Sequence, residues 1–251
     1  DPEGMLTWGF DQLGTMPTIY NYPYYPEHIK AIGGFEIDNK YVENKLMVPE
    51  AVPEKYAKIA AMIQKRYNLH VVKLTKKMVF DEGYGQKIFD LINATYSHLY
   101  GYSQLTQKQI NQYIKMYLGM LDLEFVTLIE DWSGDERKLV GAGISMPSLS
   151  IALQKCHRGR MLPFGWWHLL RAIKFHKTKI VDLLLVGILP EYRAKGANAL
   201  LFADLIPIYQ KYGIEWGETQ VEMETNTAVQ GQWGPLSPIQ HKRRECYIKK
   251  I

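Results

Sequence analysis

The sequence has little cysteine and no long apolar run. Its two cysteines, Cys156 and Cys246, do not form a Cys-x-x-Cys pair. They cannot supply the disulfide framework of a small secreted domain, so we expect a reducing compartment, the cytoplasm. The longest apolar run, residues 183–189, is as long as a strand and far short of the roughly 20 residues that a membrane-spanning helix needs. We therefore expect no membrane partner.

Neither charge sign dominates, and metal-ligand motifs are lacking. The 251 residues contain 30 Lys+Arg and 26 Asp+Glu, a net charge of +4, and this near balance argues against nucleic acid as a partner. The 7 histidines show neither the His-Glu-x-x-His spacing nor another metal-ligand spacing, so we expect no metal. Hydrophobic residues make up 47% of the chain, enough for a sizeable globular core.

The first 48 residues differ from the rest in composition. They are rich in Tyr, Pro and Gly, and Pro49 and Pro53 follow in a connector. Because proline restricts both its own backbone and that of the preceding residue, we expect a boundary there. The predicted domains are an N-terminal segment, 1–50, and a main domain, 51–251.

In the main domain, apolar spacing predicts alternating strands and helices. Residues 123–130 and 138–146 flank a turn-forming cluster and predict a β-hairpin. Further predicted strands and helices are a strand over 69–79, a strand over 149–155, a helix over 164–174, a buried strand over 180–189, a helix over 196–212, and strands over 219–224 and 244–251.

The stretch from residue 183 to residue 201 is the most informative. It predicts a buried strand, then a tight loop that contains Arg193, Lys195 and Gly196, then a helix. Successive backbone N–H groups at a helix start, with the helix dipole behind them, can bind a diphosphate. An ordinary strand–turn–helix connection has the same pattern, so the residues alone leave both interpretations open.

This stretch resembles motif A of the GNAT N-acyltransferase superfamily, Arg/Gln-x-x-Gly-x-Gly/Ala after a strand that ends in Pro-Glu-Tyr. Arg193 and Gly196 match the first two fixed positions, whereas Asn198 stands where Gly or Ala is usual. The order of predicted elements over residues 70–251 is also similar to that family. The resemblance implies an α/β fold with a mixed, twisted central sheet flanked by helices. It also implies that segment 1–50 is a small α/β remnant of a preceding GNAT-like domain in a tandem protein.

The resemblance implies an acyl-CoA-dependent N-acyltransferase, with acetyl-CoA or another acyl-CoA as cofactor and a small-molecule or peptide amine as acceptor. In that family the strand before the loop binds pantetheine through its backbone and the loop binds the diphosphate. The matching positions are Val186, Gly187, Ile188, Arg193, Ala194, Lys195, Gly196, Ala197 and Asn198, with Asn226 in a later motif.

Three carboxylates are candidate catalytic bases. Asp182 is the one ionisable residue in an aliphatic strand, at the position where related enzymes carry a glutamate base. Burial there would raise its pKa, as a base at neutral pH requires, but a side chain that caps the strand end and faces solvent fits the same pattern. Glu222 and Glu224 alternate along the following strand and could hold the amine or relay its proton, although such a row is also typical of a solvated strand face.

One departure leaves catalysis open. Many GNAT proteins carry Asn-x-x-Ala-x-x-x-Tyr, whose Tyr is a general acid, but here Asn226 is followed by Val229 and Trp233 at the last two fixed positions. Tyr192 and Tyr247 are candidate substitutes. A non-catalytic acyl-CoA-binding module and an aminoacyltransferase similar to the Fem enzymes remain alternatives, and a homodimer is left open. The basic run 241–244 predicts a solvated strand entrance, with an acidic substrate or the 3′-phosphate of coenzyme A as the alternative contact.

Overall fold

The computed structural model describes residues 4–250, so the first three residues of the predicted segment 1–50 lie outside it. The chain divides into two compact units. Unit 1 consists of residues 49–146 and 183–211, and unit 2 of residues 4–48, 147–182 and 212–250. The expected boundary near residue 50 coincides with a change of unit. The N-terminal segment, however, forms one unit with two later parts of the chain.

Unit 1 contains the predicted β-hairpin and the strand–loop–helix stretch. Its sheet follows the order β6-β5-β4-β3, in which β4 is antiparallel to both β3 and β5. Its elements are α2 (Glu54–Tyr67), β3 (Leu69–Lys73), α3 (Lys76–Phe80), α4 (Tyr84–Tyr96), α5 (Gln107–Tyr113), the π-helical turn η1 (Ile114–Leu118), the 3₁₀ turn η2 (Leu123–Phe125), β4 (Val126–Asp131), β5 (Lys138–Pro147, the last residue in unit 2), β6 (Ile180–Ile188, from Leu183 on), α8 (Pro190–Arg193) and α9 (Asn198–Lys211).

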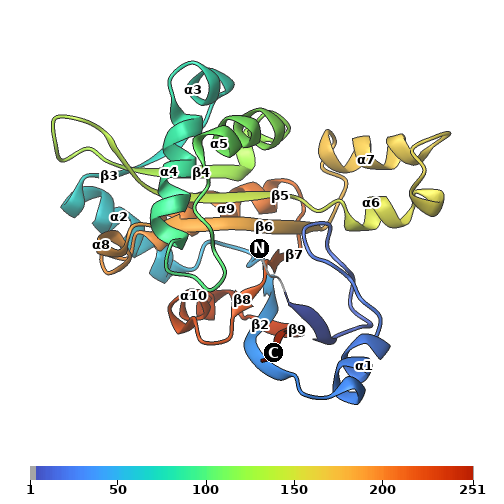
Figure 1. Cartoon of the computed structure of the whole chain (residues 1–251). Helices are drawn as coiled ribbons and strands as arrows, with labels where there is room; N and C mark the ends of the chain where they lie inside the picture. Colours follow the sequence, from blue (N-terminus) through green and yellow to red (C-terminus); the bar gives the residue numbers. More distant parts are fainter. Residues whose placement is uncertain (1–3, 251) are drawn as a thin grey trace. The chain divides into compact units, whose positions relative to one another are not determined.

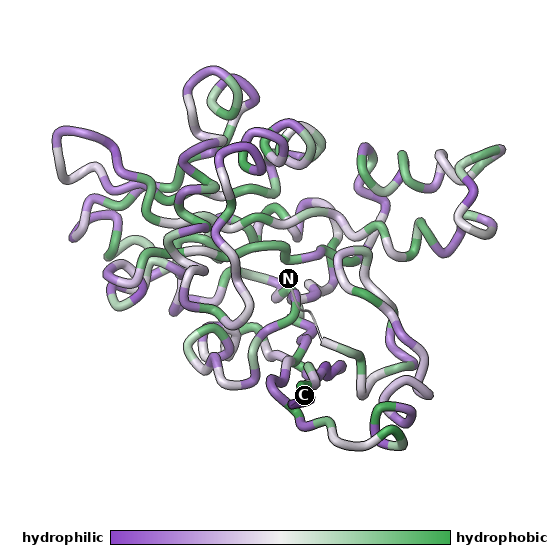
Figure 2. The backbone as a smooth tube through the Cα atoms, viewed as in Figure 1, coloured by the Kyte–Doolittle hydropathy of each residue, from purple (hydrophilic) through white to green (hydrophobic). Residues whose placement is uncertain are grey.

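Both faces of the unit 1 sheet are covered, which explains why every residue of β4 is buried. Leu128 packs in a cluster with the α4 residues Ile88 and Ile92, whereas its neighbour Ile129 packs with Ile63 of α2 and Leu200 of α9. Adjacent strand residues point to opposite faces, so the helices bury both sets (Figure 1). The strands of this unit are accordingly mostly hydrophobic (Figure 2). Each fully buried Leu or Ile contributes about 1.5–3 kcal/mol.

Unit 2 has an antiparallel sheet in the order β1-β9-β2-β7. The short strand β8 also pairs with β2, at residues 41–42, whereas β7 pairs with residues 45–47. Its elements are β1 (Met5–Trp8), α1 (Tyr24–Ile32), β2 (Glu36–Met47), α6 (Ser150–Gln154), the 3₁₀ turn η3 (His157–Gly159), α7 (Gly165–Ile173), the first three residues of β6, β7 (Trp216–Thr219), β8 (Glu222–Met223), α10 (Thr227–Gln232), the 3₁₀ turn η4 (Gly234–Leu236) and β9 (Ile239–Ile248).

Two predicted strands are wrong in part. The strand expected over 69–79 ends at Lys73, because Thr75 caps α3 by accepting a hydrogen bond from the Met78 amide. The strand expected over 149–155 is α6. Ser148 begins this turn, since its hydroxyl accepts a hydrogen bond from the Ser150 amide at 3.4 Å.

The predicted hairpin, the helix over 164–174, the strand over 180–189 and the helix over 196–212 are confirmed as β4–β5, α7, β6 and α9. The mixed α/β architecture, with a twisted sheet flanked by helices, is therefore confirmed (Figure 1). Among residues 4–250, no helix combines the length and the apolar character needed to cross a membrane.

Candidate functional site

The end of β6 presents its backbone to a tyrosine. The Tyr96 hydroxyl, at the end of α4, donates to the Val186 carbonyl at 3.1 Å and accepts from the Val186 amide at 3.3 Å. One phenol therefore satisfies both backbone groups of Val186. These are the groups for which the resemblance implies a pantetheine contact.

The two residues after Val186 have structural roles in unit 1. A Cβ on Gly187 would lie 2.9 Å from the Thr95 hydroxyl oxygen, so the close packing of α4 on β6 requires glycine here. The Ile188 carbonyl accepts a hydrogen bond from Arg193 Nε at 2.7 Å. The predicted loop arginine thus ties the loop to the strand that precedes it.

The loop between α8 and α9 is a series of tight turns. Gly196 has a φ of 82°, in the left-handed region that glycine adopts without steric cost. The amides of Lys195 and Ala197 each donate to the Tyr192 carbonyl at 3.2 Å, and the Gly196 amide donates to the Arg193 carbonyl at 2.9 Å. The sequence predicts that loop amides bind a diphosphate, but in this conformation these three amides are already hydrogen-bonded.

The loop also contains a cation, Lys195, and a buried residue, Ala197. Lys195 Nζ lies 4.2 Å from the ring centroid of Tyr192 and 5.1 Å from that of Tyr67, which fixes its charge above two aromatic faces. Ala197 is fully buried in the core with α2, whereas Ala194 is exposed. Asn198 begins α9 and is half-buried.

Asp182 is fully buried at the start of β6, not solvent-facing. Neither of its carboxylate oxygens has a hydrogen-bond partner among the described residues. Burial, reinforced by the negative charge of Glu218, raises the pKa of Asp182 to about 7, although nearby Ser148 and Lys242 act in the opposite direction. Its pKa suits a base, but its fully enclosed position gives a substrate no access.

We expect Asp182→Asn to stabilise the protein more at higher pH. A raised folded-state pKa means that the unfolded chain ionises first, so Asp182 costs stability progressively from pH ~4 to ~7. Asparagine carries no such cost. The gain from the substitution should therefore be about 3 kcal/mol larger at pH ~8 than at pH ~5 in urea unfolding, at about 1.4 kcal/mol per pKa unit.

Asp135→Asn is the matched control, because Asp135 is exposed in the turn between β4 and β5. It should change stability by a similar small amount at both pH values. An equal effect of Asp182→Asn at the two pH values would contradict the assignment of a raised pKa.

Glu222 is the best-placed carboxylate for proton transfer. It is half-buried on β8, where Trp233 Nε1 donates to Oε1 at 2.6 Å and Asn44 Nδ2 donates to Oε2 at 3.3 Å. Burial raises the pKa of Glu222 to about 7, against the lowering by these two hydrogen bonds. This side chain is partly accessible, held in one orientation, and able to change protonation near neutral pH.

The indole of Trp233 thus has a role that the sequence did not reveal. It stands where the family motif has a tyrosine, and it is buried, but it holds the carboxylate of Glu222 rather than delivering a proton. Its N–H is a donor only, so it fixes Glu222 without competing for the proton that Glu222 would accept.

The other predicted site residues of this region lie apart from that arrangement. Glu224 is exposed, and its position fits the solvated end of a strand. Asn226 is the N-cap of α10, where its side-chain oxygen accepts from the Val229 amide at 3.4 Å. This contact accounts for Asn226 without a cofactor.

Neither tyrosine considered as a general acid is free. The Tyr192 hydroxyl donates to Asp131 at 2.7 Å, and the Tyr247 hydroxyl donates to Glu245 at 2.6 Å. Burial, together with these carboxylates, raises the pKa of Tyr192 to about 12 and that of Tyr247 as well. Both are weaker acids than an ordinary tyrosine.

A buried ion cluster in unit 2 has no counterpart in the sequence analysis. Lys242 Nζ lies 3.1 Å from Glu43 Oε2 and 2.6 Å from Glu218 Oε1, and all three side chains are at most 2% exposed. Arg244 also pairs with Glu43, and His241 Nε2 lies 2.7 Å from Glu218 Oε1. The expectation that run 241–244 is a solvated strand entrance is therefore wrong, because His241, Lys242 and Arg244 are buried and only Arg243 of the run is exposed.

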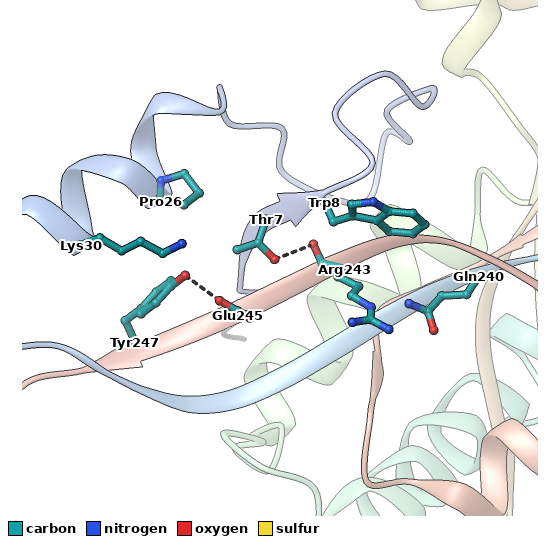
Figure 3. A pocket seen from close by; sticks show the side chains of 8 residues that line it. All are labelled: Thr7, Trp8, Pro26, Lys30, Gln240, Arg243, Glu245 and Tyr247. Atoms are coloured by element: carbon teal, nitrogen blue, oxygen red, sulfur yellow. Dashed lines mark hydrogen bonds between the residues drawn. The ribbon is translucent and has the colours of Figure 1, made fainter.

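Unit 2 also has a pocket of about 620 Å³ whose lining includes Trp8 of β1, Lys30 of α1 and Arg243 of β9 (Figure 3). Two residues considered from the sequence, Tyr247 and Arg243 of the run 241–244, line it, whereas the predicted acyl-CoA-binding residues and the three candidate carboxylates do not. Two hydrogen bonds brace its wall, from Tyr247 to Glu245 and from the Thr7 hydroxyl to the Arg243 carbonyl at 3.4 Å. Among the described residues, no group of three or more His, Cys, Asp or Glu side chains is placed to hold a metal ion.

The chain is similar to two curated proteins. No family model matches it. Protein YghO of Escherichia coli (strain K12) is 20% identical over 255 residues, which cover 99% of this chain and 62% of that protein. The bacterial ceramide synthase of Caulobacter vibrioides (strain NA1000 / CB15N) is 21% identical over 175 residues, which cover 66% of this chain and 43% of that protein. The chain thus spans less than two thirds of the length of either relative.

Solved structures show the fold. A GCN5-related N-acetyltransferase from Sphaerobacter thermophilus superposes with a TM-score of 0.52 at 10% identity, over 88% of this chain and 55% of the other. The likeness agrees with the element order from β3 to β9 and with the strand–loop–helix stretch at its centre. The chain therefore has the fold of the GCN5-related N-acetyltransferases.

Proposed function

We propose that this protein transfers an acyl group from an acyl-CoA to an amine, with Glu222 as the general base. The observation that carries the proposal is the Glu222 carboxylate, partly accessible, with its pKa raised to about 7 and each oxygen held by one donor. The fold supports acyl transfer as the class of reaction. The name of one relative, bacterial ceramide synthase, supports it further, since a ceramide is an amide.

Glu222 would act on the acceptor. A primary amine is protonated at neutral pH and must lose a proton before its lone pair can react. Trp233 and Asn44 hold the carboxylate in place, so it does not have to be reoriented for each turnover. A bound acyl-CoA would supply the thioester carbonyl that the amine attacks: the amide C–N bond would form, the C–S bond would break, and coenzyme A would leave as a thiolate that takes up a proton.

Residues of unit 1 fit coenzyme A. The Val186 backbone N–H and C=O are bonded to one tyrosine hydroxyl, a partner that an amide of pantetheine can replace group for group. Lys195 and the exposed Arg193 supply cations at the start of α9, where the helix dipole favours phosphate. Because three loop amides are already bonded, we expect the cations rather than these amides to make the first contact.

Coenzyme A thioesters should raise the melting temperature, and Lys195→Glu should abolish most of this shift. Ligand at tenfold to a hundredfold above its dissociation constant adds about 1.5–3 kcal/mol by mass action. Lys195→Glu tests the loop better than a Gly196 substitution does, because any side chain at Gly196 strains the left-handed backbone. Lys65→Glu, an exposed lysine on α2, is the control and should keep the full shift.

Tyr96→Phe gives a second arm of the same titration. Without its hydroxyl, Val186 has no competing partner, so coenzyme A should bind about 2- to 10-fold more tightly, the value of one or two neutral hydrogen bonds. Absence of any melting shift with acetyl-CoA, long-chain acyl-CoA and free coenzyme A would reject cofactor binding. Unchanged affinity in both Lys195→Glu and Tyr96→Phe would move the site elsewhere.

A non-catalytic acyl-CoA-binding module is the second candidate. Trp233 in place of the family's tyrosine favours it, because an indole N–H at that motif position cannot deliver a proton as a phenol does. Tight binding of acyl-CoA without release of free thiol in the presence of a panel of amines would select this alternative.

A further inference from the structure

The segment over residues 147–181 is here called the basic hairpin. Its two helices, α6 and α7, pack against each other through small side chains. The residues buried between α6 and α7 include Ala152, Cys156, Gly165 and Ala172. The Cys156 sulfur lies 3.4 Å from the carbonyl oxygens of both Ala152 and Gly165. A Cβ at Gly165 would lie 2.1 Å from the Arg160 carbonyl oxygen, so only glycine fits this contact. The two helices lie close together for this reason.

Close packing through small residues turns the large apolar side chains outward. Leu162 is 75% exposed and Phe164 is 71% exposed, both in the turn before α7. Figure 2 shows hydrophobic stretches along this hairpin, interrupted by hydrophilic ones. The exposed large apolar residues of the hairpin are Ile151, Leu153, Met161, Leu162, Phe164, Trp166, Trp167, Ile173 and Phe175. Isolated exposed apolar side chains are common, but a concentration of this kind in one short segment marks an interaction surface.

The charge of the hairpin has one sign. Residues 147–181 contain no Asp or Glu and seven cations, Lys155, Arg158, Arg160, Arg171, Lys174, Lys177 and Lys179. With a net charge of +4 for the whole chain, the rest of the chain carries 4 − 7 = −3. Lys179 pairs with Glu215 at 2.5 Å, whereas the exposed Lys174 and Lys177 have no carboxylate partner among the described residues. The positive charge of this protein is therefore concentrated beside its exposed apolar side chains.

We propose that the basic hairpin binds the surface of an anionic lipid bilayer. Leu, Met, Phe and Trp side chains enter the boundary between head groups and acyl chains, and Lys and Arg contact the lipid phosphates. Adjacent Trp166 and Trp167, with ring centroids 5.8 Å apart, are the residue type enriched at that boundary. The lack of a long apolar run led us to expect no membrane partner, but that lack concerns spanning a bilayer and not lying on its surface.

The composition distinguishes lipid from nucleic acid. Single-stranded nucleic acid is bound by aromatic rings that stack on bases, together with cations. Here the most exposed apolar side chain is Leu162, and Met161, Leu153 and Ile173 are exposed as well. Aliphatic side chains have no stacking role, whereas each is stabilised by contact with acyl chains. An anionic bilayer therefore accounts for all three classes of exposed side chain on the hairpin: aliphatic, aromatic and cationic.

Vesicle co-sedimentation of the whole protein tests the proposal. We expect binding to vesicles rich in phosphatidylglycerol and at least tenfold weaker binding to phosphatidylcholine alone. Leu162→Glu/Phe164→Glu and Lys174→Glu/Lys177→Glu should each reduce the binding by about tenfold or more. Because these four side chains are exposed, folding should be preserved, and a parental melting temperature would verify it.

Two matched controls separate the hairpin from general effects. Met120→Glu replaces an apolar side chain that is 69% exposed on unit 1, and Lys65→Glu/Lys108→Glu removes two exposed cations of α2 and α5. Both should bind vesicles as the parent does. Lipids brominated in their acyl chains should quench tryptophan fluorescence, and Trp166→Phe/Trp167→Phe should lose most of the quenching. Failure to bind anionic vesicles, equal binding by hairpin and control variants, or binding of single-stranded RNA in place of vesicles would overturn the proposal.

Discussion

Glu222→Gln is expected to lower the turnover of acyl transfer by ~10²–10⁴ and to leave the affinity for coenzyme A unchanged. The amide keeps the size of the side chain, and its one oxygen can still accept from Trp233, but it has no second acceptor for Asn44 and cannot accept the proton of the amine. General base catalysis contributes about this factor in enzymes. Steady-state rates with saturating acyl-CoA, together with a binding titration, measure the two quantities separately.

The pH dependence of the turnover rate should show the ionisation of Glu222. Glu222 is active when deprotonated, so the rate should rise with pH and level off above pH ~7, the value to which burial raises its pKa. The hydrogen bond from the Trp233 indole lowers the pKa of Glu222. Trp233→Phe removes this bond, so the pKa should rise and the midpoint of the rate profile should move to higher pH. A change of Trp233 that only loosened the fold would lower the rate without moving the midpoint.

Glu224→Gln is the matched control, since Glu224 is the exposed carboxylate two residues further along. We expect less than about a twofold change in turnover, because Glu224 is exposed and lies outside the arrangement in which Trp233 and Asn44 hold Glu222. Loss of activity in Glu224→Gln with normal activity in Glu222→Gln would reverse the assignment.

Elements that depend on local pattern could be predicted from the sequence. The aliphatic run of β6 and the apolar spacing of α9 appear within a short window, and both elements lie within two residues of their expected bounds. Segment 149–155 shows the limit of this approach. Short apolar runs fit a strand or a helix equally well, and here the Ser148 hydroxyl selects the helix.

Contacts between distant parts of the chain could not be predicted. Lys242 and Glu43 are 199 residues apart, and only the pairing of β2 with β9 brings them together. The burial of Asp182 was foreseen from its aliphatic neighbours, but its isolation from any hydrogen-bond partner depends on which groups surround it. Trp233 and Glu222 are only 11 residues apart, and a signal was present there, an aromatic N–H donor at a motif position near a strand carboxylate.

Lys242→Met is expected to cost about 3–5 kcal/mol in the free energy of unfolding, the usual cost of removing one partner from a buried ion pair. Methionine fills a similar volume, so the loss is electrostatic. Glu43 retains Arg244, whereas Glu218 keeps only its contact with His241 among its ion-pair partners in the described part of the chain. Asp182, whose pKa already responds to the charges of Glu218 and Lys242, loses its stabilising cation in the same step.

Arg243→Met is the control, because Arg243 is the exposed neighbour of Lys242 on β9 and should change stability by less than about 0.5 kcal/mol.

The double variant Lys242→Met/Glu218→Gln should recover part of the loss, since it removes the unpaired charge as well as its partner. The deficit of Lys242→Met should also shrink at pH ~5, where Asp182, whose pKa is raised to about 7, is protonated. Urea unfolding of the four proteins at two pH values measures all three effects. A Lys242→Met variant as stable as Arg243→Met would show that the cluster contributes no net stability, and an additive loss in the double variant would show that Lys242 and Glu218 act independently.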